Sequence, residues 1–312
     1  MIVVQAPLRI GIAGGGTDLP VWANVRIGKC LSLAIKPCVY ALLVNRFDHK
    51  VVAAYSQIEN ARRITEIGHG LIRECALNLG VLDGIEVHTV SAITSKGSGL
   101  GASSSFAVAL IKLFATYCGI ILSPIEVATR AWQVEIDRLR RPIGRQDHMA
   151  ASFGGLRLYR FEKDKAYLEE TFTEDDSNWI SSVLKLVPLS SGHDACKILE
   201  NVSSQSMLIP AYDSVEEAVT AIRTRDVERL GRAVSMGMQS KRAIPGAVSS
   251  EIEEKIDNIK TTLSVGKLRG IKVCGAGGGG YLLLVVEPGT HVSDVLNYKP
   301  SFSGAVCLVE EK

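Results

Sequence analysis

Residues 96–118 combine a glycine-rich turn with an apolar helix, an arrangement that can bind phosphate groups. Glycines occupy every second position from Gly97 to Gly101, and three serines follow at 103–105. Glycine adopts backbone conformations that a Cβ forbids and lets the main chain approach a ligand closely. From Phe106 onward apolar residues recur at helical spacing. Because a helix N-terminus presents free N–H groups and partial positive charge, this is a candidate phosphate-binding turn.

The serines of this turn have two interpretations. Serine is a favoured N-cap residue, so the stretch could simply begin a buried helix. The hydroxyls also suit a Mg²⁺ ion that bridges phosphate oxygens, because Mg²⁺ prefers oxygen ligands. No Gly-Lys-Ser/Thr closes the turn, which excludes a Walker A loop. The stretch alone leaves both interpretations open.

A second group of polar residues lies near the N-terminus. A predicted strand containing Arg9 runs into three glycines, followed by Thr17 and Asp18. Arg9 can pair with a carboxylate or a phosphate, and Asp18 can accept hydrogen bonds from sugar hydroxyls. The simpler alternative is a glycine turn in which Asp18 caps the following segment.

The predicted helix at residues 125–138 carries two acids. Glu135 lies at the edge of its apolar stripe, where it could reach into a cleft and bind a metal ion. The alternative is a surface ion pair with Arg138, and we expect Asp137 to pair with Arg141 in the same way.

Asp147 begins a short apolar helix that ends at two glycines, and N-capping alone explains its position. A carboxylate at a helix N-terminus with Arg145 nearby would also stay ionised, as a general base must. The arginines at 138–145 are either a solvated surface or a patch that steers an anionic substrate.

Residues 270–286 contain the pattern GxGxxG, but an apolar strand follows it instead of a helix. The dinucleotide-binding fingerprint requires the helix, so this loop argues against a Rossmann site. We expect a strand–glycine loop–strand unit whose backbone packs closely against a ligand or another loop.

Composition excludes several classes of protein. The net charge of +2 provides no electrostatic case for nucleic-acid or membrane partners. No run approaches the roughly 18 apolar residues of a membrane span. Seven scattered cysteines without a CxxC pair are typical of reduced thiols in an intracellular protein. With no basic, apolar leader before the first strand, we expect a cytoplasmic protein.

The predicted strands and helices do not alternate strictly, which favours an α+β fold. The charged, turn-rich residues 161–176 indicate a junction, so we expect domains at 1–176 and 177–312. In the first domain we predict strands at 31–35, 39–44, 51–55 and 85–93 and helices at 69–79, 105–118 and 125–138. In the second we predict a strand at 183–188, helices at 195–206, 215–236 and 251–265, and two late strands.

Together, three stretches resemble the motifs of the GHMP kinase family (galacto-, homoserine, mevalonate and phosphomevalonate kinases). The N-terminal strand and turn, the Gly-x-Gly-Leu-Gly-Ser-Ser loop and the late Gly-Ala-Gly-Gly-Gly-Gly loop occur in order at 9–20, 97–104 and 272–280. Ala102 replaces the first serine of the central motif. The resemblance implies a two-domain α+β fold, with an N-terminal domain like ribosomal protein S5 domain 2 and a ferredoxin-like C-terminal domain.

The resemblance also implies ATP and Mg²⁺ as cofactors and assigns roles to individual residues. Asp147 would accept or orient the proton of the attacking hydroxyl, with Arg9 beside it and near the γ-phosphate. Ser103 and Glu135 would hold Mg²⁺. The ATP phosphates would be bound by Gly97, Ser98, Gly99, Leu100, Gly101, Ala102, Ser103 and Ser104. The substrate would contact Gly15, Gly16, Thr17, Asp18, Gly277 and Gly278.

Within the family, the sugar 1-kinases are most similar, above all the D-glycero-D-manno-heptose 7-phosphate kinases, at residues 6–20, 69–74 and 146–155. Galactokinases have Glu-His where this chain has Gly15-Gly16, which leaves room for a longer sugar. The implied reaction is phosphorylation of the anomeric (C1) hydroxyl of a sugar phosphate by a monomer or homodimer.

Two departures from the heptose kinase pattern stand out. Arg145 replaces an expected lysine, and His193-Asp194 replaces a Ser-Arg pair, which removes one candidate phosphate anchor. The resemblance therefore leaves a fucokinase- or galactokinase-like activity and an ATP-dependent decarboxylase of a diphosphorylated acid as alternatives. A non-catalytic nucleotide or sugar sensor is a third, although a sensor has no need of the base Asp147.

Overall fold

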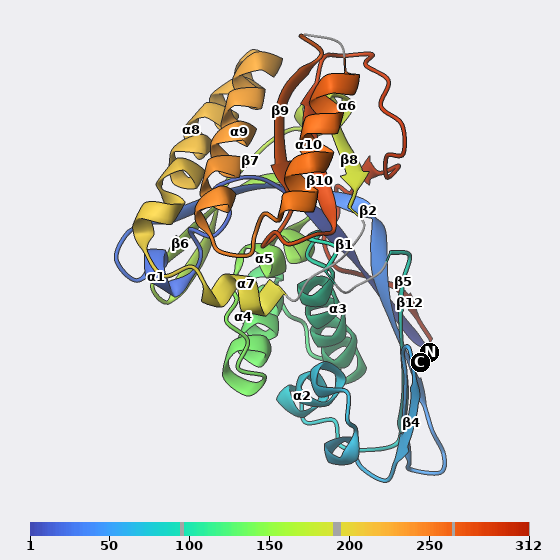
Figure 1. Cartoon of the computed structure of the whole chain (residues 1–312). Coiled ribbons are helices and arrows are strands. Elements are labelled where there is room, and N and C mark those ends of the chain that lie inside the picture. Colours follow the sequence, from blue (N-terminus) through green and yellow to red (C-terminus); the bar gives the residue numbers. More distant parts are fainter. Residues whose placement is uncertain (94–96, 190–194, 264–265, 312) are drawn as a thin grey trace.

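The computed structural model describes residues 1–93, 97–189, 195–263 and 266–311, and it combines two β-sheets with packed helices (Figure 1). Strands and helices do not alternate strictly along the chain, and most strand pairs are antiparallel. The fold is therefore α+β, as the sequence predicts.

The strands in the described residues are β1 (Ile2–Ala13), β2 (Gly28–Asn45), β3 (Val51–Ala54), β4 (Ile58–Ala61), β5 (Ile85–Ser91), β6 (Leu156–Glu162), β7 (Lys165–Thr171), β8 (Leu184–Pro188), β9 (Leu268–Val273), β10 (Tyr281–Val286), β11 (Lys299–Pro300) and β12 (Val306–Glu310). The α-helices are α1 (Pro20–Ala23), α2 (Gly70–Asn78), α3 (Ala102–Tyr117), α4 (Pro124–Gln133), α5 (Gln146–Phe153), α6 (Glu174–Val183), α7 (Ala195–Glu200), α8 (Ile209–Thr224), α9 (Val227–Ala243) and α10 (Ser250–Thr262). Two short 3₁₀ segments, η1 (Ile64–Glu66) and η3 (Gln205–Leu208), and one π-helical segment, η2 (Val134–Arg138), complete the elements.

The larger sheet is built around the long strand β2. Strand β1 pairs along one side of β2, while β5 and β6 share its other side, β6 on the first half and β5 on the second. Helix α3 packs on β1 and β2 and is buried on nearly all sides, which explains its apolar composition. The amide of Arg9 on β1 donates to the carbonyl of Leu100 over 3.0 Å, so the turn before α3 is held against β1.

The smaller sheet has the order β8–β10–β9 and is covered by α9 and α10. Helices α8 and α9 pack side by side, at the upper left of Figure 1, and α8 also contacts β1 and β2 of the larger sheet. One apolar cluster joins residues of both sheets, including Leu8 of β1 and Leu283 of β10. The two sheets therefore share a continuous core, which fixes β9 relative to β1.

The chain ends meet at the edge of the larger sheet, where β12 pairs with β1 (Figure 1). Strand β11 likewise returns to β2. Both strands come from the segment predicted as the second domain, 177–312. The boundary at 176 remains a prediction, and the sheet partners show how closely the two segments are joined.

Two predictions of local structure were wrong. The predicted helix at 215–236 is two helices, α8 and α9, because Arg225 adopts a left-handed conformation and the Asp226 side chain caps α9. The predicted turn-rich segment 161–176 contains the strand β7, whose charged residues are tolerated because β7 pairs only with β6 in the described residues.

The two strands predicted at 31–35 and 39–44 are one continuous strand, β2. The other predicted elements agree with the structure within a few residues, except at two helix ends. Helix α4 continues as the π-helical segment η2 beyond Gln133, and α7 ends at Glu200. Among the described residues no helix is long and apolar enough to span a membrane.

Candidate active site

One cavity of about 680 Å³ gathers side chains from distant parts of the chain. Ligand pockets commonly have volumes of about 300–1,000 Å³. The predicted site residues that line it are Arg9, Gly15, Gly16, Asp18, Gly97, Ser98, Gly99, Gly101, Ala102, Ser103, Ser104, Glu135 and Asp147. After the roles that the family resemblance implies, we call the part of the cavity formed by the turn before α3 and Glu135 the nucleotide end, and the part formed by the turn after β1 the acceptor end.

The glycine turn reaches α3 through left-handed backbone conformations at Gly97, Gly99 and Gly101. Gly101 is the N-cap of α3 and, lacking a side chain, provides no capping bond. The serines therefore do not cap the helix, contrary to the simpler interpretation of the sequence. The first-turn N–H groups of α3 have no partner within the helix, and they lie at the cavity wall where an anion can bind them.

The back of this turn is closed by the late glycine loop between β9 and β10. A Cβ on Gly99 would lie 2.7 Å from the carbonyl oxygen of Cys274, and a Cβ on Gly280 would lie 2.3 Å from that of Ser98. Only glycine permits this approach of backbone to backbone. The late loop is thus a wall packed against the first loop, as predicted.

Arg9 and Asp147 form a bidentate ion pair at the centre of the cavity. The Nε and Nη2 atoms of Arg9 donate to the two Asp147 oxygens over 2.8 and 2.9 Å, and Nη1 donates to the Gly99 carbonyl over 2.5 Å. Burial opposes the charge on Arg9, but Asp147 outweighs it and raises the Arg9 pKa. Asp147 remains partly exposed to the cavity, so its carboxylate is fixed in direction and accessible to a ligand.

Glu135 is fully buried except for its contact with the cavity, and four side chains hold its carboxylate. Ser103 and Ser104 donate over 3.0 and 2.9 Å, His148 Nε2 lies 2.7 Å away, and Arg141 forms an ion pair. Burial acts to raise the pKa of Glu135, but His148 and Arg141 outweigh it and lower that pKa to about 2. The carboxylate is therefore ionised and pre-oriented beside the glycine turn.

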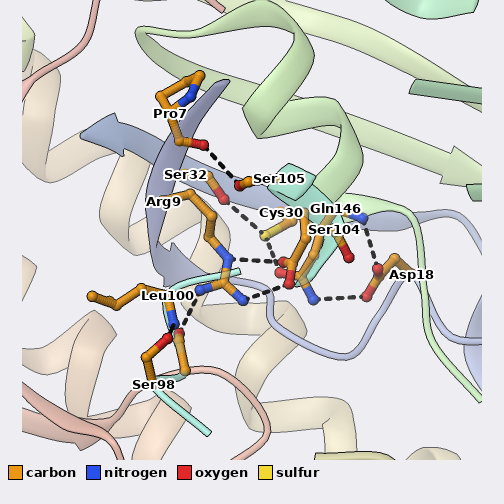
Figure 2. A network of polar contacts seen from close by, with 12 residues as sticks. Pro7, Arg9, Asp18, Cys30, Ser32, Ser98, Leu100, Ser104, Ser105 and Gln146 are labelled. Carbon is orange, nitrogen blue, oxygen red and sulfur yellow. Dashed lines mark hydrogen bonds and ion pairs between the residues drawn. The ribbon is translucent and has the colours of Figure 1, made fainter. Parts of the chain in front are cut away.

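Asp18 is held by the residue that precedes Asp147. The backbone and side-chain amides of Gln146 donate to its two oxygens over 2.9 and 3.0 Å, as Figure 2 shows. Burial raises the pKa of Asp18. A Cβ at residue 144 would lie 1.9 Å from Asp18, so Gly144 is required for this contact. Because each carboxylate oxygen can accept a second bond, Asp18 can still receive a ligand hydroxyl from the cavity.

Comparisons with known proteins agree with this geometry. Residues 63–155, which include the glycine turn, Glu135 and Asp147, match the GHMP kinases N terminal domain. The chain contains a GHMP kinase domain. It is also 29% identical over 311 residues to the D-glycero-alpha-D-manno-heptose 7-phosphate kinase of Campylobacter jejuni, covering 92% of this chain and 90% of that protein. The comparisons thus show a small-molecule kinase whose residues 63–155 match a GHMP kinase N-terminal domain.

Two further relatives extend the comparison. A crystal structure of a D-glycero-D-manno-heptose 1-phosphate kinase from Bacteroides thetaiotaomicron superposes with a TM-score of 0.79 at 19% identity, covering all of both chains. This likeness shows that the fold is the α+β fold of GHMP kinases. The L-fucokinase/L-fucose-1-P guanylyltransferase of Bacteroides fragilis is 23% identical over 334 residues, and the match spans 91% of this chain but 34% of that protein.

Some residues predicted from the GHMP kinase motifs do not line the cavity. Thr17 is fully buried and its hydroxyl bonds the Gly14 and Lys29 carbonyls. Leu100 is likewise a core residue. Gly277 and Gly278 pack against Ala247, while Gly275 and Ala276 face the cavity in their place.

One predicted charge contact, between Asp137 and Arg141, was wrong, and Arg145, expected near Asp147, is held elsewhere. Arg145 stacks on Trp132, with its guanidinium 4.0 Å from the ring centroid, and bonds backbone carbonyls of residues 162 and 163. The partner of Asp147 is therefore Arg9. Arg141 pairs with Glu135 and not with Asp137, because the π-helical turn places Glu135 toward the cavity. The departure at His193-Asp194 lies outside the described residues.

Sequence reasoning assigned no role to three residues of the site: the cavity residues Lys241 and Lys272, and the buried His148, which bonds Glu135. His148 follows Asp147 by one residue, which could have indicated a role. Lys241 lies three and four residues after Met238 and Gly237 on the buried face of α9, so a lysine on an apolar stripe was the available signal.

Proposed function

We propose that this GHMP kinase is ATP- and Mg²⁺-dependent and transfers the γ-phosphate to the anomeric hydroxyl of a sugar phosphate. The observation that carries the proposal is the Arg9–Asp147 pair, which lies in one cavity with the glycine turn and the ionised Glu135. A fixed carboxylate beside a phosphate-binding turn is the arrangement that in-line phosphoryl transfer requires.

Asp147 would accept the proton of the acceptor hydroxyl or orient that hydroxyl toward the γ-phosphate. Its two bonds from Arg9 fix the plane of the carboxylate, and its exposure to the cavity leaves room for the hydroxyl. Arg9 is cationic and close to the glycine turn through Gly99, so it also offsets negative charge on the transferred group.

The residues at the nucleotide end fit a Mg²⁺ ion. Ser103 and Glu135 present a hydroxyl and an ionised carboxylate 3.0 Å apart, and both are hard oxygen ligands. Arg141 already places a cation against the same two oxygens, which shows that the site accommodates positive charge. When bound, Mg²⁺ would neutralise charge on the β- and γ-phosphates.

We propose D-glycero-D-manno-heptose 7-phosphate as the acceptor. The support is the C. jejuni heptose 7-phosphate kinase relative and the Gly15–Gly16 turn, which carries no side chains that would shorten the cavity. The B. fragilis relative favours a second candidate, phosphorylation of a free sugar such as fucose at C1. We expect a monomer or homodimer in the cytoplasm.

The decisive experiment is ADP release, measured with a coupled assay, against heptose 7-phosphate, fucose, galactose, mannose, mevalonate and homoserine. Turnover with the heptose phosphate alone is the expected result. Turnover with an unphosphorylated sugar would support the kinase activity but show that heptose 7-phosphate is not the acceptor. Binding of ATP without turnover on any of these compounds would favour a nucleotide sensor.

A further inference from the structure

Two lysines from the C-terminal half of the chain extend into the cavity wall. Lys241 lies near the end of α9, and Lys272 lies on β9. They are only 9% and 6% exposed, respectively. Lysine is almost never so deeply buried unless a negative group is provided for it. We call these two residues the lysine pair.

The lysine pair has few partners in the part of the chain that the structure describes. Lys272 Nζ donates to the carbonyl of Ile12 over 2.8 Å, and Lys241 Nζ donates to the carbonyl of Ala276 over 3.4 Å. Neither lysine forms an ion pair with a described carboxylate. Because an ammonium group carries three N–H donors, each lysine retains donors for a ligand.

The electrostatic surroundings make this arrangement costly for the unliganded protein. Burial, together with the positive charge of Arg9 and, for Lys241, that of Lys272, lowers the pKa of both lysines to about 8. The carboxylate of Asp147 already accepts two hydrogen bonds from Arg9, and both carboxylate oxygens of Asp18 accept hydrogen bonds from Gln146. An apolar side chain would satisfy the packing of α9 against β9, so packing does not explain the two charges.

The position of the lysine pair is the acceptor end of the cavity. Ile12, which Lys272 bonds, lies just before the glycine turn that leads to Asp18. Lys241 lines the same wall as Leu208 and Ile244. The phosphates of a nucleotide already have the N–H groups of α3 and the hydroxyl of Ser103 at the nucleotide end.

We propose that the lysine pair binds a phosphate group carried by the acceptor and so makes the kinase selective for phosphorylated substrates. The inference rests on the proposed function, whose acceptor is a sugar phosphate. Two buried ammonium groups and a phosphate dianion complement each other in charge and in number of hydrogen bonds.

Two ammonium groups could equally bind the γ-phosphate that is transferred from ATP. The experiment distinguishes this phosphate from the phosphate of the acceptor. Lys241→Met removes the ammonium and keeps the length of the side chain, and Lys267→Met, at an exposed position just before β9, is the matched control. KM and kcat are measured with heptose 7-phosphate, with the free heptose and with ATP for each variant.

If the lysine pair binds the acceptor phosphate, Lys241→Met raises the KM for heptose 7-phosphate by about ten- to a hundredfold, the range expected for a lost charged hydrogen bond. The KM for ATP and both kinetic constants with free heptose stay within about twofold of the wild type. Lys267→Met leaves KM and kcat unchanged with all three compounds. Lys272→Met is expected to act in the same direction.

If kcat/KM falls equally with heptose 7-phosphate and with free heptose, or if the KM for ATP rises, the lysine pair contacts the transferred phosphate. Either result would overturn the proposal. Unchanged kinetics in a folded variant would overturn it as well. Failure of the proposed function is a separate outcome: the wild-type enzyme would then not turn over heptose 7-phosphate. In that case calorimetric binding of heptose 7-phosphate, free heptose and inorganic phosphate to the wild type and Lys241→Met still tests the lysine pair.

Discussion

The two ends of the cavity differ in whether their cationic side chains are paired with carboxylates. At the nucleotide end Arg141 is matched with Glu135, and at the adjoining centre of the cavity Arg9 is matched with Asp147. At the acceptor end the lysine pair meets only backbone carbonyl oxygens among the described residues. A matched pair is rigid before any ligand arrives, whereas an unmatched cation gains its partner from the ligand.

This difference in pairing corresponds to two requirements of the proposed site, orientation of the reacting groups and specificity for a charged substrate. The catalytic groups that we propose need a fixed direction, which the bidentate Arg9–Asp147 contact and the four donors around Glu135 provide. Specificity for a charged substrate needs buried charge that is satisfied only when that substrate is bound. The predictions below change one end at a time.

The largest effect is expected from Asp147→Asn. An amide cannot accept the proton of the acceptor hydroxyl and loses the ion pair with Arg9, so kcat should fall by about 10²- to 10⁴-fold. ATP affinity should change by only a few-fold. The coupled ADP assay measures kcat, and Asp137→Asn, an exposed change on η2, is the control. A near-normal kcat for Asp147→Asn would show that Asp147 is not the base of the reaction.

Glu135→Gln is expected to act next most strongly. The neutral amide is a poor ligand for Mg²⁺, so the Mg²⁺ concentration for half-maximal activity should rise by about ten- to a hundredfold. Titration of Mg²⁺ against binding of a non-hydrolysable ATP analogue gives the same comparison without turnover. Exposed Glu254→Gln on α10 is the control. An unchanged Mg²⁺ requirement would leave Glu135 as a structural carboxylate.

The acceptor end is expected to respond to pH. The lysines are protonated below their lowered pKa of about 8, and the cationic form is needed to bind phosphate. The charged or titratable groups that act on their pKa values, besides the two lysines themselves, are Arg9, Asp18, Cys30 and Cys274. A sugar phosphate, with a second pKa near 6, is already a dianion at pH 7. The KM for heptose 7-phosphate should therefore rise about tenfold from pH 7 to pH 9, as the protonated fraction of each lysine falls.

The matched comparison is free heptose, whose KM should remain nearly constant over the same range. If both KM values rise in parallel, the titrating group is not specific for the acceptor phosphate, and the contrast between the two ends of the cavity disappears.

The smallest effect is expected from Arg141→Met. Its guanidinium contacts Ser103 and Glu135, the same oxygens that we assign to Mg²⁺. Removing this competitor should lower the Mg²⁺ concentration for half-maximal nucleotide binding by about two- to threefold, as expected for a partly exposed ion pair. Exposed Arg138→Met is the control. A higher Mg²⁺ requirement would instead show that Arg141 supports the site directly.

Features carried by short stretches of sequence were predictable. The alternating glycines, the apolar helix after them and the strand–glycine loop–strand unit all appear as expected. Asp147 and Glu135 were also singled out from their position at a helix start and at the edge of an apolar stripe, and both line the cavity, while their roles stay predictions. Each of these signals lies within about ten residues of chain.

Partners chosen by tertiary packing were not predictable in this way. Arg145 is two residues from Asp147, yet Trp132 and nearby carbonyls hold it elsewhere. The burial of Lys241 and Lys272 depends on how α9 packs between the two sheets. Sequence spacing carries no information on that packing, so the lysine pair could be described only from the structure.

The contact between the two glycine loops has a consequence for synthesis of the chain. The turn up to Ser104 leaves the ribosome well before Gly275, which closes its back. At about 5–20 residues per second, the interval is roughly ten to thirty seconds. Throughout that time the nascent protein carries a nucleotide turn without its wall, and β12, the outer partner of β1, is still to come. A growing chain of this protein thus completes the wall of its cavity only after Gly275 has been synthesised.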